Sequence, residues 1–451
     1  MNTVLLRGDK PEIEAWQVLV HVCRRWRSLV FRSPLRLDLR LYCTPETPAK
    51  DKLDVWPALP LFVRGETAIS SGTDNVIASL GQSNRVCGVS LCIWYLARWQ
   101  LEKVMAAMQV PFPALIYLQL WSDWSRRDET PPVIPDSFLG GSAPRLRNFY
   151  LDGIPFPGLP KLLLSATHLV SLSLINIPHS GYISPEAIVA LVSPLSSLEE
   201  LSFGFRSPQS RPDWQSRSLL PPKRSILPAL SRLDFKGATE YLEELVTRID
   251  TPQLHRMKIT FFNQIDFDCP RLAQFINSTP TLMALDGARV QFFDFTAHVK
   301  LRYRTFQSGL AGLTIEISCG EPDWQLSSIE QVCNFSLHPI STVEVLYIEH
   351  EYSELVWKND GVENTLWLEL LLPFTAVKNL CLSKEFAPGI AATLEELVGS
   401  RITEVLPRLE NIFVEGLEPS GPFQKNIGRF VAARQLSGHP IAILYETKTP
   451  T

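Results

Sequence analysis

Histidine, cysteine and carboxylate side chains are the groups of this chain that could bind a metal ion or transfer protons. The densest cluster of them is His350 with Glu349, Glu351 and Glu354. The eight histidines form neither a His-x-x-x-His nor an HExxH motif, and the eight cysteines form no Cys-x-x-Cys pair. A metal site also needs ligands held by rigid elements. We therefore interpret the His350 cluster as a solvated edge and predict no metal site and no disulfide framework.

Glycine-rich and serine motifs that bind phosphates or activate a nucleophile are also missing. The chain has no GxxxxGK[ST], GxGxxG or GxSxG pattern. Gly140-Gly141-Ser142 comes closest to a phosphate loop, but no lysine follows it, and we interpret it as a turn before Pro144. The sequence thus predicts a protein that is not an enzyme and uses no cofactor.

Charge and hydropathy narrow the class of partner. The chain has 451 residues, is 45% hydrophobic and 20% charged, and carries a net charge of -4. It can bury a core, but it has no general attraction to nucleic acid or to an anionic membrane. No segment has the pattern of a signal peptide or of a membrane span. We expect an intracellular protein, cytoplasmic and/or nuclear, that binds neither nucleic acid nor membrane.

One strand-like phrase recurs along most of the chain. The pattern apolar-x-x-apolar-x-apolar is met or nearly met twelve times at intervals of 23 to 34 residues, and only LMALDG fails, at its last position. The end of each phrase alternates as a strand with one buried face does. Recurrence at this period indicates stacked supersecondary units. The phrases begin at Val86, Leu115, Leu146, Leu169, Leu198, Leu230, Leu254, Leu282, Leu310, Val343, Val377 and Leu409.

Segments between the phrases have helical spacing. Ser184-Pro185-Glu186 opens one helix with a serine cap and a proline in the first turn. Further helices are expected at 159–169, 241–249, 366–372 and 394–398, and a closing helix and strand at 423–446. Proline stands two residues before six phrases, where it ends the preceding helix. Loops are expected at 122–136, 206–225 and 319–326.

Repeated strand, turn and helix predict an α/β fold. We expect a right-handed, leucine-rich-repeat-like solenoid, a curved parallel sheet with helices outside, over residues 85–447. A connecting segment at 46–84 is expected to precede it. Before that segment, Ala15–Phe31 has one apolar helical stripe.

The sequence VCRRWRSLVFRSPLRLDL, from Val22, resembles the last helix and exit of the F-box. Cys23, Trp26 and Leu29 fall on the Cys-x-x-Trp-x-x-Leu core of that module. The whole chain is similar to fungal, basidiomycete-type F-box proteins with irregular leucine-rich repeats. In those proteins, too, a stretch like 54–60 follows the helix and the array ends like 431–438.

The resemblance implies a substrate-recognition subunit of an SCF-type (Skp adaptor–cullin–F-box) ubiquitin ligase. A partial F-box-like segment over residues 1–45 would bind a Skp-type adaptor, and through it the cullin subunit, by Val22, Cys23, Trp26 and Leu29. The usual opening of an F-box, Leu-Pro and an apolar helix, has no counterpart before Pro11. The chain is therefore expected to be either a truncated gene product or a divergent member that does not dock. The alternative is a repeat-based scaffold with no ligase connection, whose N-terminal helix caps the solenoid.

Repeat geometry predicts a second surface, for a protein client that the sequence does not identify. Where the fourth and sixth residues of a phrase point into the core, the third and fifth lie on the concave face of the sheet. Tyrosine, tryptophan and arginine are enriched at interaction hot spots. The same rule places Val345 on this face. The predicted client-binding residues are Tyr117, Gln119, Trp121, Tyr150, Arg232, Arg256, Lys258 and Tyr347.

Overall fold

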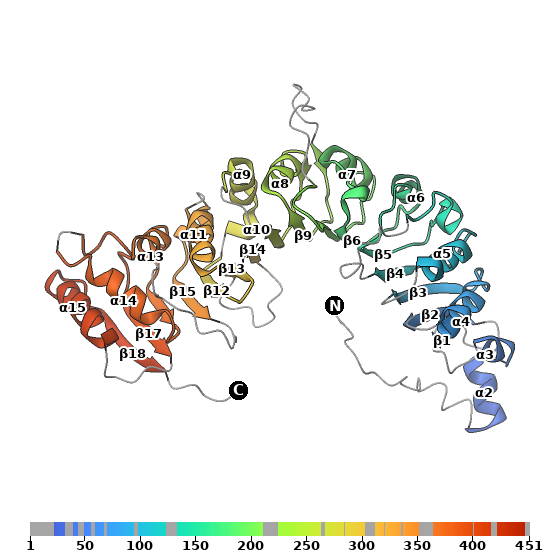
Figure 1. The fold of residues 1–451 in the computed structure, drawn as a ribbon, viewed down its shortest axis with the longest axis horizontal. Coiled ribbons are helices and arrows are strands. Elements are labelled where there is room, and N and C mark those ends of the chain that lie inside the picture. Colours follow the sequence, from blue (N-terminus) through green and yellow to red (C-terminus); the bar gives the residue numbers. More distant parts are fainter. Residues whose placement is uncertain are drawn as a thin grey trace. The chain divides into compact units, whose positions relative to one another are not determined.

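The computed structural model places strands and helices in two compact units (Figure 1). Unit 1 comprises Met1–Tyr182 and Pro194–Leu198, and unit 2 comprises Ile183–Ser193 and Glu199–Thr451. No helix in the part of the chain that the structure describes is long and apolar enough to cross a membrane. The structure describes residues 22–31, 39–43, 49–55, 59–66, 70–93, 98–122, 133–210, 224–262, 267–283, 285–302, 312–319, 321–334, 337–350, 364–399, 401–415 and 422–446.

Unit 1 contains a parallel sheet whose strands pair in chain order. These strands are β1 (Leu39–Cys43), β2 (Leu61–Glu66), β3 (Val86–Ile93), β4 (Tyr117–Ser122), β5 (Asn148–Asp152) and β6 (Ser171–Ile177). Its helices are α2 (Arg24–Phe31), α3 (Ala49–Val55), α4 (Ser70–Leu80), α5 (Arg98–Ala107) and α6 (Leu159–Ser165), with 3₁₀ turns at Phe138–Gly141 and His179–Gly181.

Unit 2 contains a longer sheet in the order β7-β9-β11-β14-β13-β12-β15-β16-β17-β18, and a separate short pair, β8 and β10. The strands are β7 (Glu200–Phe205), β8 (Ser225–Ile226), β9 (Arg232–Gly237), β10 (Ile249–Asp250), β11 (Arg256–Phe261), β12 (Gly287–Phe292), β13 (Thr296–Arg302), β14 (Gly312–Ser318), β15 (Val345–His350), β16 (Asn379–Leu382), β17 (Asn411–Glu415) and β18 (Ala442–Glu446). The helices are α7 (Pro185–Val192), α8 (Thr239–Val246), α9 (Pro270–Ser278), α10 (Pro280–Met283), α11 (Pro322–Cys333), α12 (His338–Ser341), α13 (Asn364–Leu371), α14 (Ala387–Glu395) and α15 (Pro422–Leu436).

Most of the recurring phrases form a turn followed by a strand. In ten of the twelve phrases the strand begins at the third residue, as Tyr117 does after Leu115. The amide of the first apolar residue donates to the carbonyl three residues earlier, as in Leu115 N to Phe112 O at 3.1 Å and Leu230 N to Leu227 O at 3.3 Å. The prolines before the phrases, such as Pro113, occupy the second position of these turns, where their fixed φ is suited. The repeat thus sets the start of each strand by one hydrogen bond.

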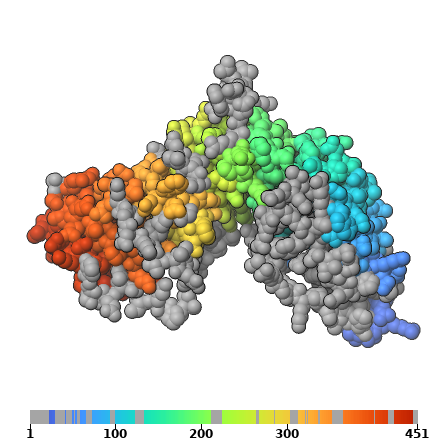
Figure 2. All heavy atoms as spheres, viewed as in Figure 1, coloured from blue at the N-terminus to red at the C-terminus, as the bar shows by residue number. Residues whose placement is uncertain are grey.

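Strand residues alternate between a buried face and a half-exposed face, as predicted. In β4, Leu118 and Leu120 are buried while Tyr117, Gln119 and Trp121 are half-exposed. Figure 1 shows helices along one side of each unit's sheet, and we call the other side of each sheet its helix-free face. In Figure 2 the colour changes gradually along each unit, as stacking of successive repeats requires. The predicted α/β repeat architecture is therefore confirmed for the described residues.

The sheet is not parallel throughout, contrary to the prediction. In the phrase LMALDG, Leu282 and Met283 end α10, and the strand begins only at Gly287. From β12 the chain turns back within residues 293–295 into β13, which is antiparallel to both β12 and β14. The reason is a segment of clean alternation, Thr296–Arg302, that follows β12 too closely to allow a helix between them.

Other boundaries also differ from the predictions. Within the expected connecting segment 46–84, β2 pairs with β1 and β3, so the sheet extends N-terminal of residue 85. The loop expected at 319–326 is wrong, because Pro322 starts α11 in a position suited to proline. Val345 is buried rather than exposed on the sheet surface. The expected helix after Ser184 is confirmed, with the Ala187 amide donating to Ser184 Oγ at 3.2 Å. Most of the loops at 122–136 and 206–225 lies outside the described residues.

The last helix is attached to the array by a buried arginine. Arg434 of α15 is fully buried, and its guanidinium donates to the carbonyl oxygens of Ile402, Leu406, Pro407 and Leu409 at 3.2 to 3.4 Å. Leu406 has a φ of 48°, so this turn is held in a left-handed conformation. No carboxylate in the described ranges forms an ion pair with Arg434, and burial lowers its pKa. The carbonyl cage takes the place of a counter-ion.

Replacing Arg434 with alanine should destabilise unit 2 strongly. The substitution removes the side-chain donor of four carbonyl groups, of which Leu406 O keeps the Leu409 amide, and it opens a cavity. We expect a loss of about 2–4 kcal/mol in the free energy of unfolding. Arg429→Ala on the same helix is the matched control. Arg429 pairs with Glu395 but is 60% exposed, so its loss should cost at most about 1 kcal/mol. Equal effects in chemical denaturation would contradict the structural role of Arg434.

Candidate functional site

The helix-free face of unit 1 carries a cluster of aromatic side chains. Trp121 and Tyr150 lie with ring centroids 5.8 Å apart, and Phe62 of β2 lies 5.5 Å from Tyr117 of β4. Gly88 of the intervening β3 makes the second contact possible, since a Cβ there would come within 2.3 Å of the Phe62 ring. Large aromatic side chains held in place are efficient contact groups.

Hydrogen bonds between side chains fix these aromatic groups. The Tyr117 hydroxyl donates to Gln119 Oε1, and Ser90 Oγ donates to the same atom at 3.3 Å. The Tyr150 hydroxyl donates to Asp152 Oδ2 at 3.2 Å. Burial raises the pKa of Tyr150, and the neighbouring Asp152 charge raises it further. The four predicted client residues of unit 1, none of them charged, are thus brought together beside the Asp152 carboxylate, which helps to hold them in place.

Asn176 supports this surface from the next strand. Its side-chain amide donates to Asp152 Oδ1 at 2.8 Å, and its own backbone has a φ of 50°. Asparagine tolerates the left-handed region better than most residues. The Asp152 carboxylate therefore accepts hydrogen bonds from both the Tyr150 hydroxyl and the Asn176 amide, and these two bonds fix its position.

The helix-free face of unit 2 is charged instead of aromatic. Arg232 pairs with Asp234 at 2.6 Å, and Lys258 pairs with Glu316 at 2.9 Å. Arg256 lies in register with Arg232 on the neighbouring strand. Three strands, β14, β13 and β12, separate Lys258 from Tyr347. The predicted client residues of unit 2 therefore lie on one face, but Tyr347 lies apart from the other three.

Side chains of these three strands complete the face, and sequence reasoning missed them. Arg289 and Arg302 lie 4.9 Å and 5.9 Å from the centre of the Tyr347 ring, in cation–π range. Arg289 also pairs with Glu349 at 3.1 Å. The alternation of His298, Lys300 and Arg302 with Ala297, Val299 and Leu301 was the signal that could have revealed them.

His298 is the most perturbed titratable group of this face. Its side chain is 14% exposed, and Nε2 lies 3.7 Å from Glu316 Oε2. Burial lowers the pKa of His298 to about 4, and Lys300 and Lys258 add to the effect, whereas Glu316 opposes it. For Glu316, burial acts to raise the pKa, but the hydrogen bond and charge of Lys258 outweigh it and lower the pKa. The pair therefore holds neutral histidine beside ionised glutamate.

The predicted adaptor residues lie on or beside α2, with their side chains in solvent. Val22 is 62% exposed, Trp26 is 47% exposed and Leu29 is 56% exposed. Cys23 is exposed as well, and its Sγ accepts from the Trp26 amide at 3.5 Å. The spacing of Val22, Trp26 and Leu29 places them on one side of the helix. The N-terminal half of the expected helix, 15–21, lies outside the described residues.

Among the described residues no three histidine, cysteine or carboxylate side chains are grouped as metal ligands. Glu349 and His350 end β15, while Glu351 and Glu354 fall outside the described ranges. The side chains that gather on the two helix-free faces are suited to contact and charge pairing.

No protein-family model matches the chain, and no curated protein matches it. Among solved structures, the leucine-rich repeat-containing protein LegL7 from Legionella pneumophila is similar over 89% of this chain and 98% of its own, with 13% sequence identity and a TM-score of 0.28.

Acidification should destabilise unit 2 through His298. Its folded pKa of about 4 lies below the ordinary value of 6.5, so stability that is present above pH 6.5 is lost as the pH falls toward 4, because only the unfolded chain takes up the proton. We expect His298→Gln to lose less stability than the wild type between pH 7 and pH 5, by on the order of 1–2 kcal/mol. Urea denaturation at both pH values measures this. Identical losses in the two proteins would rule out a buried neutral histidine.

Proposed function

We propose that this protein is a non-enzymatic, repeat-based protein-binding module that serves as the substrate-recognition subunit of an SCF-type ubiquitin ligase. In this proposal the helix-free faces bind a protein client. A Skp-type adaptor, and through it the cullin subunit, binds the region of Val22, Cys23, Trp26 and Leu29. The chain itself makes and breaks no bond.

The observation that carries the binding proposal is the concentration of interaction-prone side chains on the helix-free faces. Many strands carry a tyrosine, tryptophan, arginine or lysine on these faces. Contacts within the protein hold several of these side chains in place. Preorganised aromatic and arginine side chains lose little conformational entropy when a partner binds. A broad face of this kind suits a macromolecule better than a small substrate.

The ligase part of the proposal is supported by the exposed apolar side chains of α2. A cap at the end of a solenoid covers the core with its apolar side, but Val22, Trp26 and Leu29 are each about half exposed or more. Exposed apolar side chains on one side of a helix are typical of a docking surface. This favours adaptor binding over the alternative of a scaffold with no ligase connection.

Trp26→Ala should weaken co-purification with a Skp-type adaptor. Truncation of a central interface tryptophan commonly costs 2 kcal/mol or more, about thirtyfold in affinity. Trp99→Ala is the matched control, because Trp99 is 48% exposed on α5. Binding that is absent in the wild type, or that is equal in the two variants, would support the scaffold alternative.

Photo-crosslinking should map the client to the helix-free faces. A benzoylphenylalanine at Tyr117 or Tyr347 should crosslink to a bound protein in cells. The same group at Leu164 or Trp324, which are exposed on α6 and α11, should crosslink far less. Crosslinking at Leu164 and Trp324 but not at Tyr117 or Tyr347 would place the client on the side of the helices and contradict this proposal.

A further inference from the structure

The helix layer of unit 2 is interrupted between α9 and α11. α8 packs on α9, and α11, α13, α14 and α15 pack on one another in succession. Between β11 and β15 the sheet holds β14, β13 and β12, and α11 packs on the first two. Three strands occupy about 14 Å, whereas one helix is about 10 Å wide. The extra strand of the hairpin therefore leaves more sheet than α11 covers.

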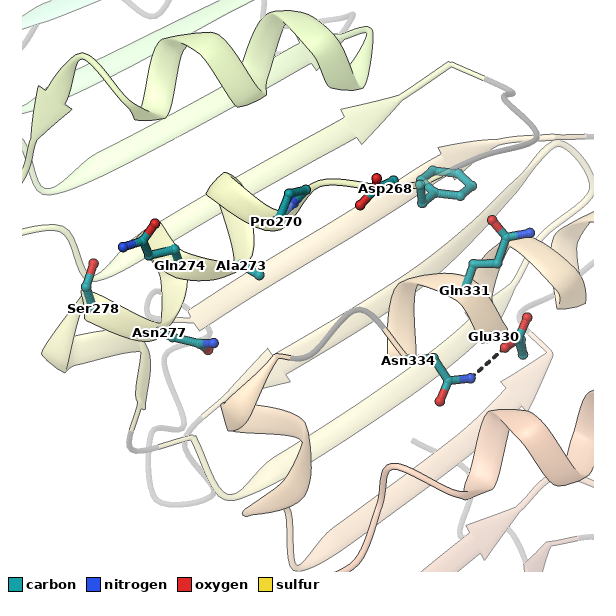
Figure 3. A pocket seen from close by; sticks show the side chains of 10 residues that line it. Asp268, Pro270, Ala273, Gln274, Asn277, Ser278, Glu330, Gln331 and Asn334 are labelled. Atoms are coloured by element: carbon teal, nitrogen blue, oxygen red, sulfur yellow. Dashed lines mark hydrogen bonds between the residues drawn. The ribbon is translucent and has the colours of Figure 1, made fainter. Parts of the chain in front are cut away.

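A groove of about 820 Å³ lies between α9 and α11 (Figure 3). Asp268, Gln274 and Asn277 line it from the α9 side, and Glu330 and Gln331 line it from α11. At one end the two sides are joined, because the His338 amide donates to Asn277 Oδ1 at 2.9 Å and α10 packs on α12.

The groove is acidic and rich in carboxamides. Glu330 accepts from the Asn334 side-chain amide at 2.5 Å, and no lysine or arginine in the described ranges forms an ion pair with it. Burial raises the pKa of Glu330, Glu369 adds to this, and the Asn334 hydrogen bond opposes it. A cation in the groove would relieve the cost of holding this carboxylate away from water.

We propose that this groove binds an extended, basic peptide segment of a partner protein. Gln274 and Gln331 can each donate to and accept from a peptide backbone, and Glu330 can pair with a lysine or arginine side chain of the segment. Phe267, Pro270 and Ala273 add apolar surface to the lining, which can contact the aliphatic parts of lysine and arginine side chains. The carboxylates of the groove repel nucleic acid and acidic lipid. The site lies on the helix layer, so it does not depend on the proposed client surfaces.

Panning a random-peptide library on the full chain tests this proposal. The selected peptides, resynthesised with a fluorescent label, should be enriched in lysine and arginine. Their affinity, measured by fluorescence anisotropy, should fall by about tenfold or more for Glu330→Lys and for Gln274→Trp, which fills the groove from an exposed position.

Matched controls separate the groove from general charge and from the helix-free face. Glu410→Lys and Gln424→Trp change exposed residues away from the groove, and Tyr347→Ala changes the helix-free face of the same unit; all three should bind as the wild type does. The proposal is overturned if no peptide is selected, if the peptides lack basic residues, or if the groove variants bind normally. Loss of binding in Tyr347→Ala alone would place the peptides on the helix-free face and equally contradict it.

Discussion

Each strand of the long sheets has to bury one apolar face, and a single strand with its helix cannot do so alone. The inward residues of β4, for example, are fully covered only because β3 and β5 lie in register on both sides and helices close the layer above. Stacking of neighbours therefore supplies most of the stability of each repeat. The turn that precedes most of the strands matters because it keeps the apolar residues in the same register from one repeat to the next. A slip of one residue would turn the whole apolar set to solvent.

The same alternation leaves the outward residues free of packing demands. Tyr117 and Arg256 occupy equivalent positions in their phrases, yet one belongs to an aromatic cluster and the other to a charged one. The core accepts either, because neither points into it. This is the physical basis on which one fold presents two chemically different faces.

Sequence reasoning predicted those parts of the fold that local periodicity and turn chemistry determine. The alternation in β4 and β5, the Ser184 cap and the closing α15–β18 unit follow from short-range patterns, and the structure agrees with them. The β12–β13 hairpin could not be placed in this way. Thr296–Arg302 reads as a strand, but its antiparallel insertion between β12 and β14 depends on pairing partners far apart in the chain, which no local pattern specifies. Tyr347 was correctly expected on the outward face, while its arginine neighbours came from the strands that the repeat phrase did not capture.

The net charge of the chain conceals a marked separation of charge. On the outward side of β7 to β15, four carboxylates, Glu200, Asp234, Glu316 and Glu349, stand among seven basic residues, Arg232, Lys236, Arg256, Lys258, Arg289, Lys300 and Arg302. That leaves 36 basic and 43 acidic residues elsewhere, from totals of 43 and 47. A partner approaching this face meets a positive surface even though the protein as a whole is negative.

Charges within one Debye length, about 8–10 Å at physiological salt, dominate such an encounter. The depressed pKa values of His298 and Glu316 are consistent with that field, since nearby lysines contribute to both. The net charge alone could not show this positive surface, because it sums the charges of the whole chain. The register of the strands decides which of those charges lie together on one face.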